Sequence, residues 1–136
     1  MDDATKRAYI EVRLAKGRDD LATAHDDLAH KHWRGAVNRA YYAVFHVASA
    51  ALMWLNIERA RHSGTQAAFG EFLVKGGIIE PEFGVIFSRA RKMREEQDYD
   101  VLSAPLSEDE ARRLVGEAER FVDRIESYLR TVGAMS

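Results

Sequence analysis

The sequence predicts an all-α protein folded as an antiparallel, up-and-down bundle of about five helices, and three observations support this prediction. No stretch of the 136 residues alternates Val, Ile and Thr as a strand does, and no Asn-Gly or Asp-Gly pair marks a hairpin. The only two prolines, Pro81 and Pro105, both fall between periodic segments. Long stretches carry apolar residues at steps of three and four, and short connections make successive helices antiparallel neighbours.

The first half of the chain contains two long helical patterns. The first helix is predicted at residues 3–30, and its apolar stripe is Ile10, Leu14, Gly17, Leu21, Ala24 and Leu28. A tight turn at residues 31–34 leads to a second helix that continues to about residue 56. The stripe of this second helix is Val37, Tyr41, Val44, Ala48, Leu52 and Leu55. A short charged break follows at residues 58–62.

The second half begins with a shorter helix, inserted between longer ones. Ser63 and Gln66 predict a capping box at its start, and Gly76-Gly77 predicts its end. A fourth helix is expected at about residues 80–97, because Pro81 suits a first helical turn. The residues that the fourth helix is expected to bury are Phe83, Ile86, Phe87, Ala90 and Met93.

The fifth helix has the clearest signals of all. Pro105 ends the preceding connection, and Ser107 with Glu110 forms a second capping box. The apolar stripe then covers five turns and consists of Ala111, Leu114, Val115, Ala118, Phe121, Val122, Ile125 and Leu129.

Length and composition describe one domain over residues 1–136, with 46% apolar and 31% charged residues. The absence of cysteine excludes disulfides, cysteine zinc sites, iron–sulfur clusters and a Cys nucleophile. The N-terminus lacks the basic start and apolar run of a signal peptide, and the longest apolar run, residues 47–55, is too short to cross a bilayer. We therefore expect a soluble, cytoplasmic protein without a membrane partner.

The overall charge does not indicate a nucleic-acid partner, because 20 Lys and Arg residues are balanced by 22 Asp and Glu residues. The distribution is more informative, since Arg89, Arg91, Lys92 and Arg94 lie within six residues. Arginine suits bidentate contacts with phosphate better than lysine does. An ordinary charged surface explains this cluster equally well.

The second helix carries polar residues beside its apolar stripe. Arg39, Tyr42 and His46 are spaced by three and then four, with Asn38 one turn before Tyr42. Seven residues make nearly two turns, so Arg39 and His46 lie about 20° apart around the helix axis. A charged residue on such a helix needs a partner, a phosphate or an exit to solvent. The alternative is that this face is simply solvated.

The fourth helix ends in a second polar group, formed by Arg91, Arg94, Asp98 and Tyr99. The cations alone could simply complement the helix dipole. An acid at a helix C-terminus is unfavourable unless it is paired. We therefore expect Asp98 to pair with Arg94, four residues earlier, and with Arg39 across the bundle.

The histidines and the missing motifs limit the possible chemistry. His62 precedes the third helix, as a capping accessory or as a functional residue. His25, His30 and His32 are interpreted as surface residues, since no HExxH pattern accompanies them. Glycine-rich phosphate loops, GxSxG elbows, zinc deaminase signatures and di-iron motifs are also missing. We expect no metal and no cofactor, so any enzyme would use Arg, His, Asp and Tyr on helices.

Three segments together resemble the small stand-alone HEPN-domain proteins, a group of nucleotide-binding domains shared by higher eukaryotes and prokaryotes. The second-helix segment, residues 35–46, reads GAVNRAYYAVFH. The downstream segments are HSG at 62–64 with FGEF at 69–72 and VKG at 74–76, and REEQDYD at 94–100. The resemblance covers nearly the whole chain.

This resemblance implies a helical homodimer with its functional residues in a cleft near the dimer interface. Many HEPN proteins are toxins encoded beside a minimal nucleotidyltransferase antitoxin, and they cleave RNA without metal. Their motif is an Arg followed four to six residues later by a His, which Arg39 and His46 match with six residues between them. The motif commonly lies on a late helix, where Arg94 is here followed by Tyr99 in place of a histidine. A tyrosine beside the motif receives AMP in some relatives, for which Tyr99 and Tyr42 are candidates.

Two functions follow as expectations. In the first, the protein is a HEPN toxin that cleaves RNA, with His46 as general acid and base and with Arg39 and Arg94 holding phosphate. Asp98 would orient an arginine or histidine. In the second, a non-catalytic module binds a nucleotide or the nucleotidyltransferase partner through the same cleft. The site residues expected to bind or orient are Asn38, Tyr42, His62, Arg91, Arg94, Asp98 and Tyr99. A structural dimer whose polar network only sets helix register is a third interpretation.

Overall fold

The computed structural model describes residues 1–99 and 105–136, with the side chain of Tyr99 outside the described part. Its elements are α1 (Asp3–Ala29), α2 (Trp33–Trp54), α3 (His62–Ala68), a π-helical segment η1 (Phe69–Val74), α4 (Pro81–Tyr99) and α5 (Glu108–Thr131). The described residues contain helices and no strand, which confirms the predicted all-α bundle. The expected stand-alone homodimer concerns a second chain and stays a prediction.

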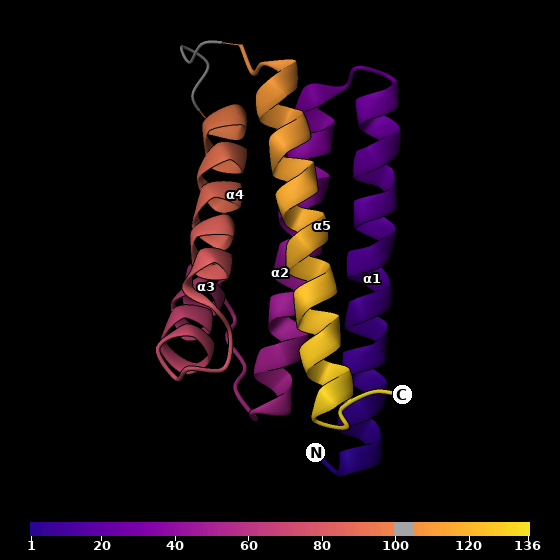
Figure 1. Ribbon diagram of the computed structural model, residues 1–136, viewed down its shortest axis with the longest axis vertical. Coiled ribbons are helices and arrows are strands. Elements are labelled where there is room, and N and C mark those ends of the chain that lie inside the picture. The colour runs from indigo at the N-terminus through magenta and orange to yellow at the C-terminus, as the bar shows by residue number, and fades with distance from the viewer. Residues whose placement is uncertain (100–104) are drawn as a thin grey trace.

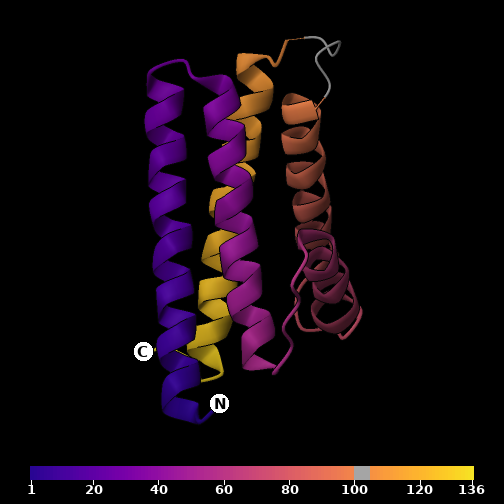
Figure 2. The same cartoon turned by 180° about the vertical axis from the view of Figure 1, so that it is seen from behind.

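The helices α1, α2 and α5 lie side by side, with α2 and α5 running in the same direction and α1 antiparallel to both, and α4 packs along α2 and α5 (Figure 1). The short α3 and η1 pack at the lower end of α4, against α2 and α4 (Figure 1). In the view from behind, α1 and α2 form the face toward the viewer, and α5 lies on their far side (Figure 2). This arrangement leaves one side of α2 uncovered by α5.

The core is made by the predicted apolar stripes. Every stripe residue of α1 and α5 is buried, and on α2 and α4 only Leu55 and Met93 remain partly exposed. Phe121 of α5 contacts three other aromatic rings, with centroids 5.2 Å from Phe69, 6.0 Å from Phe87 and 6.1 Å from Phe83. Each buried ring contributes roughly 1.5–3 kcal/mol through the area removed from water. These aromatic contacts join η1, α4 and α5.

Gly17 allows α1 to approach α2 closely. A Cβ atom at this position would lie 2.6 Å from Cγ1 of Val47 and 3.2 Å from the carbonyl oxygen of Ala43. Real Cβ atoms do not tolerate the shorter distance, so any larger residue would push the two helices apart. The spacing between α1 and α2 therefore depends on this glycine.

The predicted helix ends differ in accuracy. The capping box of α5 is confirmed, because the Ser107 hydroxyl accepts from the Glu110 amide at 3.1 Å and the Glu110 carboxylate accepts from the Ser107 amide at 3.4 Å. The capping box predicted at Ser63 and Gln66 is wrong. The helix already begins at His62, with Arg61 as an N-cap that makes no side-chain hydrogen bond. The Gln66 side chain instead accepts a hydrogen bond from Arg91 of α4.

The third predicted helix is also not one continuous α-helix. It changes at Phe69 into the π-helical segment η1, which ends at Val74, shortly before the predicted Gly76-Gly77. Gly77 then adopts a φ of 78°, a conformation that glycine accommodates without steric cost. Within the described residues, no helix has both the length and the apolar character needed to span a bilayer.

Candidate functional site

The outward side of α2 brings the predicted polar residues of this helix together. Asn38, Tyr42 and His46 are partly exposed and Arg39 is exposed, while the stripe behind them packs into the core. The residues lie on one side because they recur at steps of three and four along the helix. Their partners come from α1, α3 and α4, and these contacts divide the site into two halves.

In the first half, a single carboxylate binds both members of the predicted pair. Oδ1 of Asp20, on α1, lies 3.1 Å from Nη1 of Arg39, and Oδ2 lies 3.6 Å from Nε2 of His46. The side chains of Asp20 and His46 are only 13% and 17% exposed, so solvent screens this contact weakly. Arg39 is 50% exposed and can also reach a ligand. Sequence reasoning missed Asp20, because only the register between α1 and α2 distinguishes it from the adjacent Asp19.

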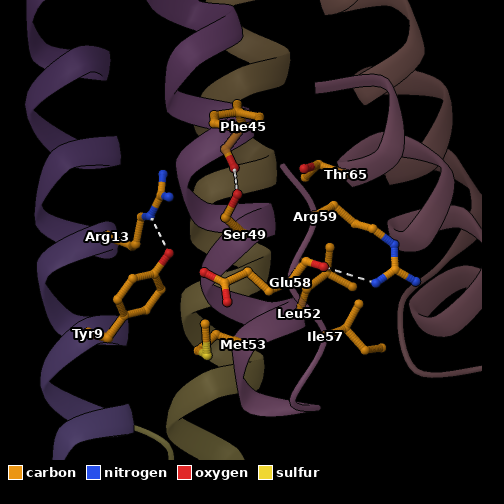
Figure 3. A pocket seen from close by; sticks show the side chains of 10 residues that line it. All are labelled: Tyr9, Arg13, Phe45, Ser49, Leu52, Met53, Ile57, Glu58, Arg59 and Thr65. Atoms are coloured by element: carbon orange, nitrogen blue, oxygen red, sulfur yellow. Dashed lines mark hydrogen bonds between the residues drawn. The ribbon is translucent and has the colours of Figure 1, made fainter. Parts of the chain in front are cut away.

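Arg13 of α1 completes this half from the other side of the imidazole. Its Nη1 lies 2.7 Å from Nδ1 of His46, and its Nε donates to the Tyr9 hydroxyl at 3.0 Å. Figure 3 shows Arg13 and Tyr9 on α1 facing Phe45 and Ser49 of α2. A guanidinium can only donate, so Nδ1 of His46 accepts and the ring proton of the neutral imidazole sits on Nε2, toward Asp20.

The surroundings of His46 favour its neutral form. Burial lowers the pKa of His46, Arg13 lowers it further, and Asp20 opposes the shift. The imidazole is therefore neutral at physiological pH, with each nitrogen facing one protein group. A proton can reach Nδ1 only when Arg13 moves away.

Two open hollows adjoin this half of the site. One of about 310 Å³ is bordered by Lys16, Asp19, Asp20, Arg39, Tyr42 and His46. The other, of about 450 Å³, is bordered by Thr23, Asp27, Arg34, Gly35, Asn38, Arg39 and Asp98. Arg39 lines both hollows, so a ligand in either one can contact its guanidinium. Each hollow falls within the range of roughly 300–1,000 Å³ that is typical of small-molecule sites.

In the second half of the site, α4 places its cations against α2 and α3. The Arg94 guanidinium lies over the rings of Tyr41 and Tyr42, 5.0 and 5.3 Å from their centroids. Cation–π contacts of this kind hold a guanidinium in place without neutralising its charge. Arg91 donates to Gln66 at 3.1 Å and to Glu95 at 2.9 Å, which links α4 to α3.

Asp98 has one of the two partners expected for it. Its Oδ2 lies 3.5 Å from Nε of Arg94, so the ion pair predicted from the spacing of four residues is present. The two groups do not have the geometry of a hydrogen bond. The second cation is Arg34 at 3.6 Å, and the expectation of Arg39 is wrong because Arg39 is bound to Asp20. Tyr99 ends α4, and its side chain lies outside the described residues.

His62 also lies in this second half, at the first position of α3. Its Nδ1 is 2.8 Å from the Tyr41 hydroxyl, and its ring stacks on Phe45 with centroids 4.1 Å apart. Tyr42 contacts both imidazoles, with ring centroids 5.8 Å from His62 and 6.3 Å from His46. The Tyr42 ring therefore connects the two halves of the site.

The remaining histidines lie apart from this site. His25 contacts Glu119 at 3.6 Å, while His30 and His32 are exposed near the turn between α1 and α2. Within the described residues, no three His, Asp or Glu side chains are grouped so as to hold a metal ion. The chemistry available at the α2 face is therefore that of imidazole, guanidinium, carboxylate and phenol groups.

The helical bundle agrees with the comparisons with known proteins. The HEPN domain family model matches residues 10–128, and the chain belongs to this family. "Putative toxin MJ0605" of Methanocaldococcus jannaschii is 36% identical over 126 residues, which cover 93% of this chain and 92% of that protein. A UPF0332 protein of Thermotoga maritima is 33% identical over 124 residues, which cover 91% and 93% of the two chains. The protein is thus a HEPN protein with toxin-like relatives.

Proposed function

We propose that this protein is the toxin of a HEPN–nucleotidyltransferase toxin–antitoxin pair and that it cleaves RNA without a metal ion in the cytoplasm. The observation that carries the proposal is the shared contact of Asp20 with Arg39 and His46 beside an open hollow. This contact holds a guanidinium and an imidazole together at a solvent-accessible surface. The names of the two Methanocaldococcus jannaschii relatives, 36% and 24% identical to this chain, support the toxin assignment.

In the proposed reaction, His46 is the general base. An RNA phosphate attracts Arg13 away from Nδ1 of His46, and the 2′-hydroxyl takes its place. Nδ1 accepts the hydroxyl proton, while Asp20 stabilises the imidazolium through Nε2. The 2′-oxygen forms a bond to phosphorus, the bond from phosphorus to the 5′-oxygen breaks, and a 2′,3′-cyclic phosphate results. Arg39 stabilises the charge on the non-bridging oxygens of the phosphate that reacts. Arg94, the other arginine expected to hold phosphate, binds the next phosphate along the RNA.

A second candidate function has its own supporting observation. Both nitrogens of His46 face protein groups, Arg13 and Asp20, so the imidazole has no free lone pair in this structure. A non-catalytic module that binds a nucleotide or the nucleotidyltransferase through the same hollows would need no proton transfer. In this function Asn38, Arg39 and Tyr42 bind the ligand.

The partners belong to the same proposal. We expect a second copy of the chain, as in the homodimers of the family, and the antitoxin to bind at the side of α2 that α5 does not cover, which faces the viewer in Figure 2. Of the two tyrosines that are candidates to receive AMP, Tyr42 is the one whose side chain the structure describes, and it is partly exposed beside His46. Sedimentation of the purified protein, alone and with the co-expressed nucleotidyltransferase, measures both associations.

The test of RNA cleavage uses the purified protein with a single-stranded RNA in excess chelator. Wild type should cleave, whereas Arg39→Ala and His46→Ala should lose about 10²- to 10⁴-fold in rate. His32→Ala, an exposed histidine outside the site, is the matched control and should cleave like wild type. Equal cleavage by all four proteins would show that this site is not responsible. If none of them cleaves and Arg39→Ala alone loses nucleotide binding, the non-catalytic function is correct.

A further inference from the structure

The imidazole of His62 is held in place by two aromatic rings and one hydrogen bond. Its ring stacks on Phe45 and contacts Tyr42 edge-on, and its Nδ1 is hydrogen-bonded to Tyr41 at 2.8 Å. Aromatic packing on two sides and a hydrogen bond in the ring plane fix both the position and the tilt of the imidazole. Only Nε2 has no hydrogen-bond partner among the described residues, which makes it the atom available to a ligand.

Tyr41 is a partner that tolerates either charge state of His62. Burial, opposed by Arg94 and Arg91, raises the pKa of Tyr41 to about 12, so the phenol stays protonated at physiological pH. A hydroxyl can donate to a neutral imidazole and accept from an imidazolium, so the bond survives protonation. This differs from Arg13 at His46, which can only donate and therefore opposes the protonated ring.

The charges beside His62 suit a phosphate ligand. Arg94 and Arg91 of α4 reach this corner, where Tyr41 and Gln66 contact their guanidinium groups. Each guanidinium also pairs with one carboxylate, Asp98 or Glu95, through its Nε, and a phosphate would bind through the other nitrogens. Burial lowers the pKa of His62, and Arg94 and Arg91 lower it further. An imidazolium formed here is therefore a stronger acid than an ordinary one.

The two imidazoles of the site border the same rings. Phe45 lies 5.7 Å from His46 and 4.1 Å from His62 between ring centroids, and Tyr42 also contacts both. The two histidines, one on α2 and one on α3, therefore lie near each other. In an in-line displacement at phosphorus, the attacking and leaving oxygens lie on opposite sides of the phosphorus, so two separate groups on different helices can serve them.

We infer that His62 is the general acid of the RNA cleavage proposed above, and that Tyr41 is its positioning residue. This inference rests on the proposed function. Nε2 of the His62 imidazolium donates its proton to the 5′-oxygen as the bond from phosphorus to that oxygen breaks. The products are a 5′-hydroxyl and a 2′,3′-cyclic phosphate, while His46 holds the proton from the 2′-hydroxyl. Water returns one proton to His62 and removes the other from His46, so nothing is oxidised or reduced.

A substrate that needs no general acid tests this role directly. In an RNA oligonucleotide with sulfur in place of one 5′-bridging oxygen, the leaving group is a thiolate, and a thiol has a pKa of about 8.5, far below that of an alcohol. On the normal RNA, His62→Ala should lose about 10²- to 10⁴-fold in rate. On the sulfur substrate it should cleave nearly as fast as wild type, whereas His46→Ala should be slow on both.

Two further variants separate proton transfer from structure. In His62→Asn an amide can still bond to Tyr41, so this variant should fold normally and show the same substrate dependence as His62→Ala. Tyr41→Phe keeps the buried ring and removes only the hydroxyl, so it should lose about tenfold on the normal RNA, equivalent to one hydrogen bond, and nothing on the sulfur substrate. A purely structural role for Tyr41 would lower both rates equally. Thermal unfolding of each variant identifies any loss of folded protein.

The outcomes distinguish this inference from the proposed function. If wild type cleaves neither substrate, the proposed nuclease activity is wrong, and the role of His62 with it. If wild type cleaves and His62→Ala cleaves the normal RNA equally well, only the inference about His62 is wrong. An equal loss by His62→Ala on both substrates would also overturn it, because a general acid acts on the leaving group alone.

Discussion

The two sides of α2 are held in place by different kinds of contact. The buried side packs against α1 and α5 through apolar residues with no more than 2% exposure, including Val37, Val44, Ala48 and Leu52. The outward side binds through charges and ring contacts to Asp20 and Arg13 of α1, His62 of α3 and Arg94 of α4. The buried side determines whether the chain folds, and the outward side determines what the folded chain can do. Substitutions on each side should therefore separate stability from activity.

The largest effect is expected on the buried side. Leu52→Ala should lower the free energy of unfolding by about 2–5 kcal/mol, because a buried leucine loses its contacts and leaves a cavity. Urea denaturation followed by circular dichroism measures this. Val85→Ala, at a position that is 54% exposed on α4, is the control and should change little. A similar loss for the two variants would contradict the distinction between buried and exposed positions.

On the outward side, a comparable effect is expected in activity alone. Asp20→Asn should lower RNA cleavage by about 10²-fold, because the imidazolium of His46 loses its counter-charge. The unfolding free energy should fall by only about 1 kcal/mol, because the asparagine oxygen can still accept from Arg39. Asp26→Asn, at an exposed position on α1, is the matched control. If Asp20→Asn lowers the unfolding free energy as much as it lowers the activity, Asp20 serves mainly to stabilise the fold, as the residues of the buried side do.

A smaller change in stability, with opposite signs at two positions, is expected when helical glycines are replaced by alanine. Gly17→Ala should destabilise the protein by about 1–3 kcal/mol, since the added methyl meets Val47 and the Ala43 carbonyl. Gly116→Ala on α5 has no atom within 4 Å of the added Cβ and should stabilise by roughly 0.5–1 kcal/mol. The same substitution thus has opposite signs at two helical glycines. Thermal and urea unfolding of both variants measure the difference.

The smallest effect concerns pH and also comes from the outward side. The pKa of His46 and that of His62 both lie below 6.5 in the folded protein, so the unfolded chain binds more protons as the pH falls. The stability contributed by the two neutral imidazoles is complete above pH 6.5 and is lost as the pH falls through their folded pKa values. A double variant, His46→Gln with His62→Gln, should show a smaller fall in urea midpoint between pH 7.5 and pH 5 than wild type. An unchanged fall would mean that other groups cause it.

The sequence predicts the fold well because helix periodicity is a local property. The stripe of α5 and its capping box at Ser107 and Glu110 involve residues within a few turns of each other, and the structure confirms both. The prediction is wrong where a distant helix intervenes. Gln66 does not cap α3, because Arg91 of α4 binds its side chain. The π-helical segment η1 has no sequence signal of this simple kind.

The candidate site is predicted only in part, because its residues come from four helices. Periodicity correctly places Arg39, Tyr42 and His46 on one side of α2, and the spacing of four correctly pairs Arg94 with Asp98. The partners from other helices depend on register, which periodicity does not give. Asp20 and Arg13 were therefore not predicted. Tyr41 was assigned to the core alone, although its hydroxyl also bonds to His62.

The carboxylate of Asp20 contacts both Arg39 and His46, so these three residues should behave as one thermodynamic unit. When one of the three residues is removed, the other two lose a contact that holds them in place and therefore contribute less to the activity. The loss of RNA cleavage in the double variant Arg39→Ala with His46→Ala, expressed as a free energy, should then be smaller than the sum of the losses in the two single variants. A chain that loses one of these residues is consequently under weaker selection to keep the others, and we expect the three to vary together among relatives.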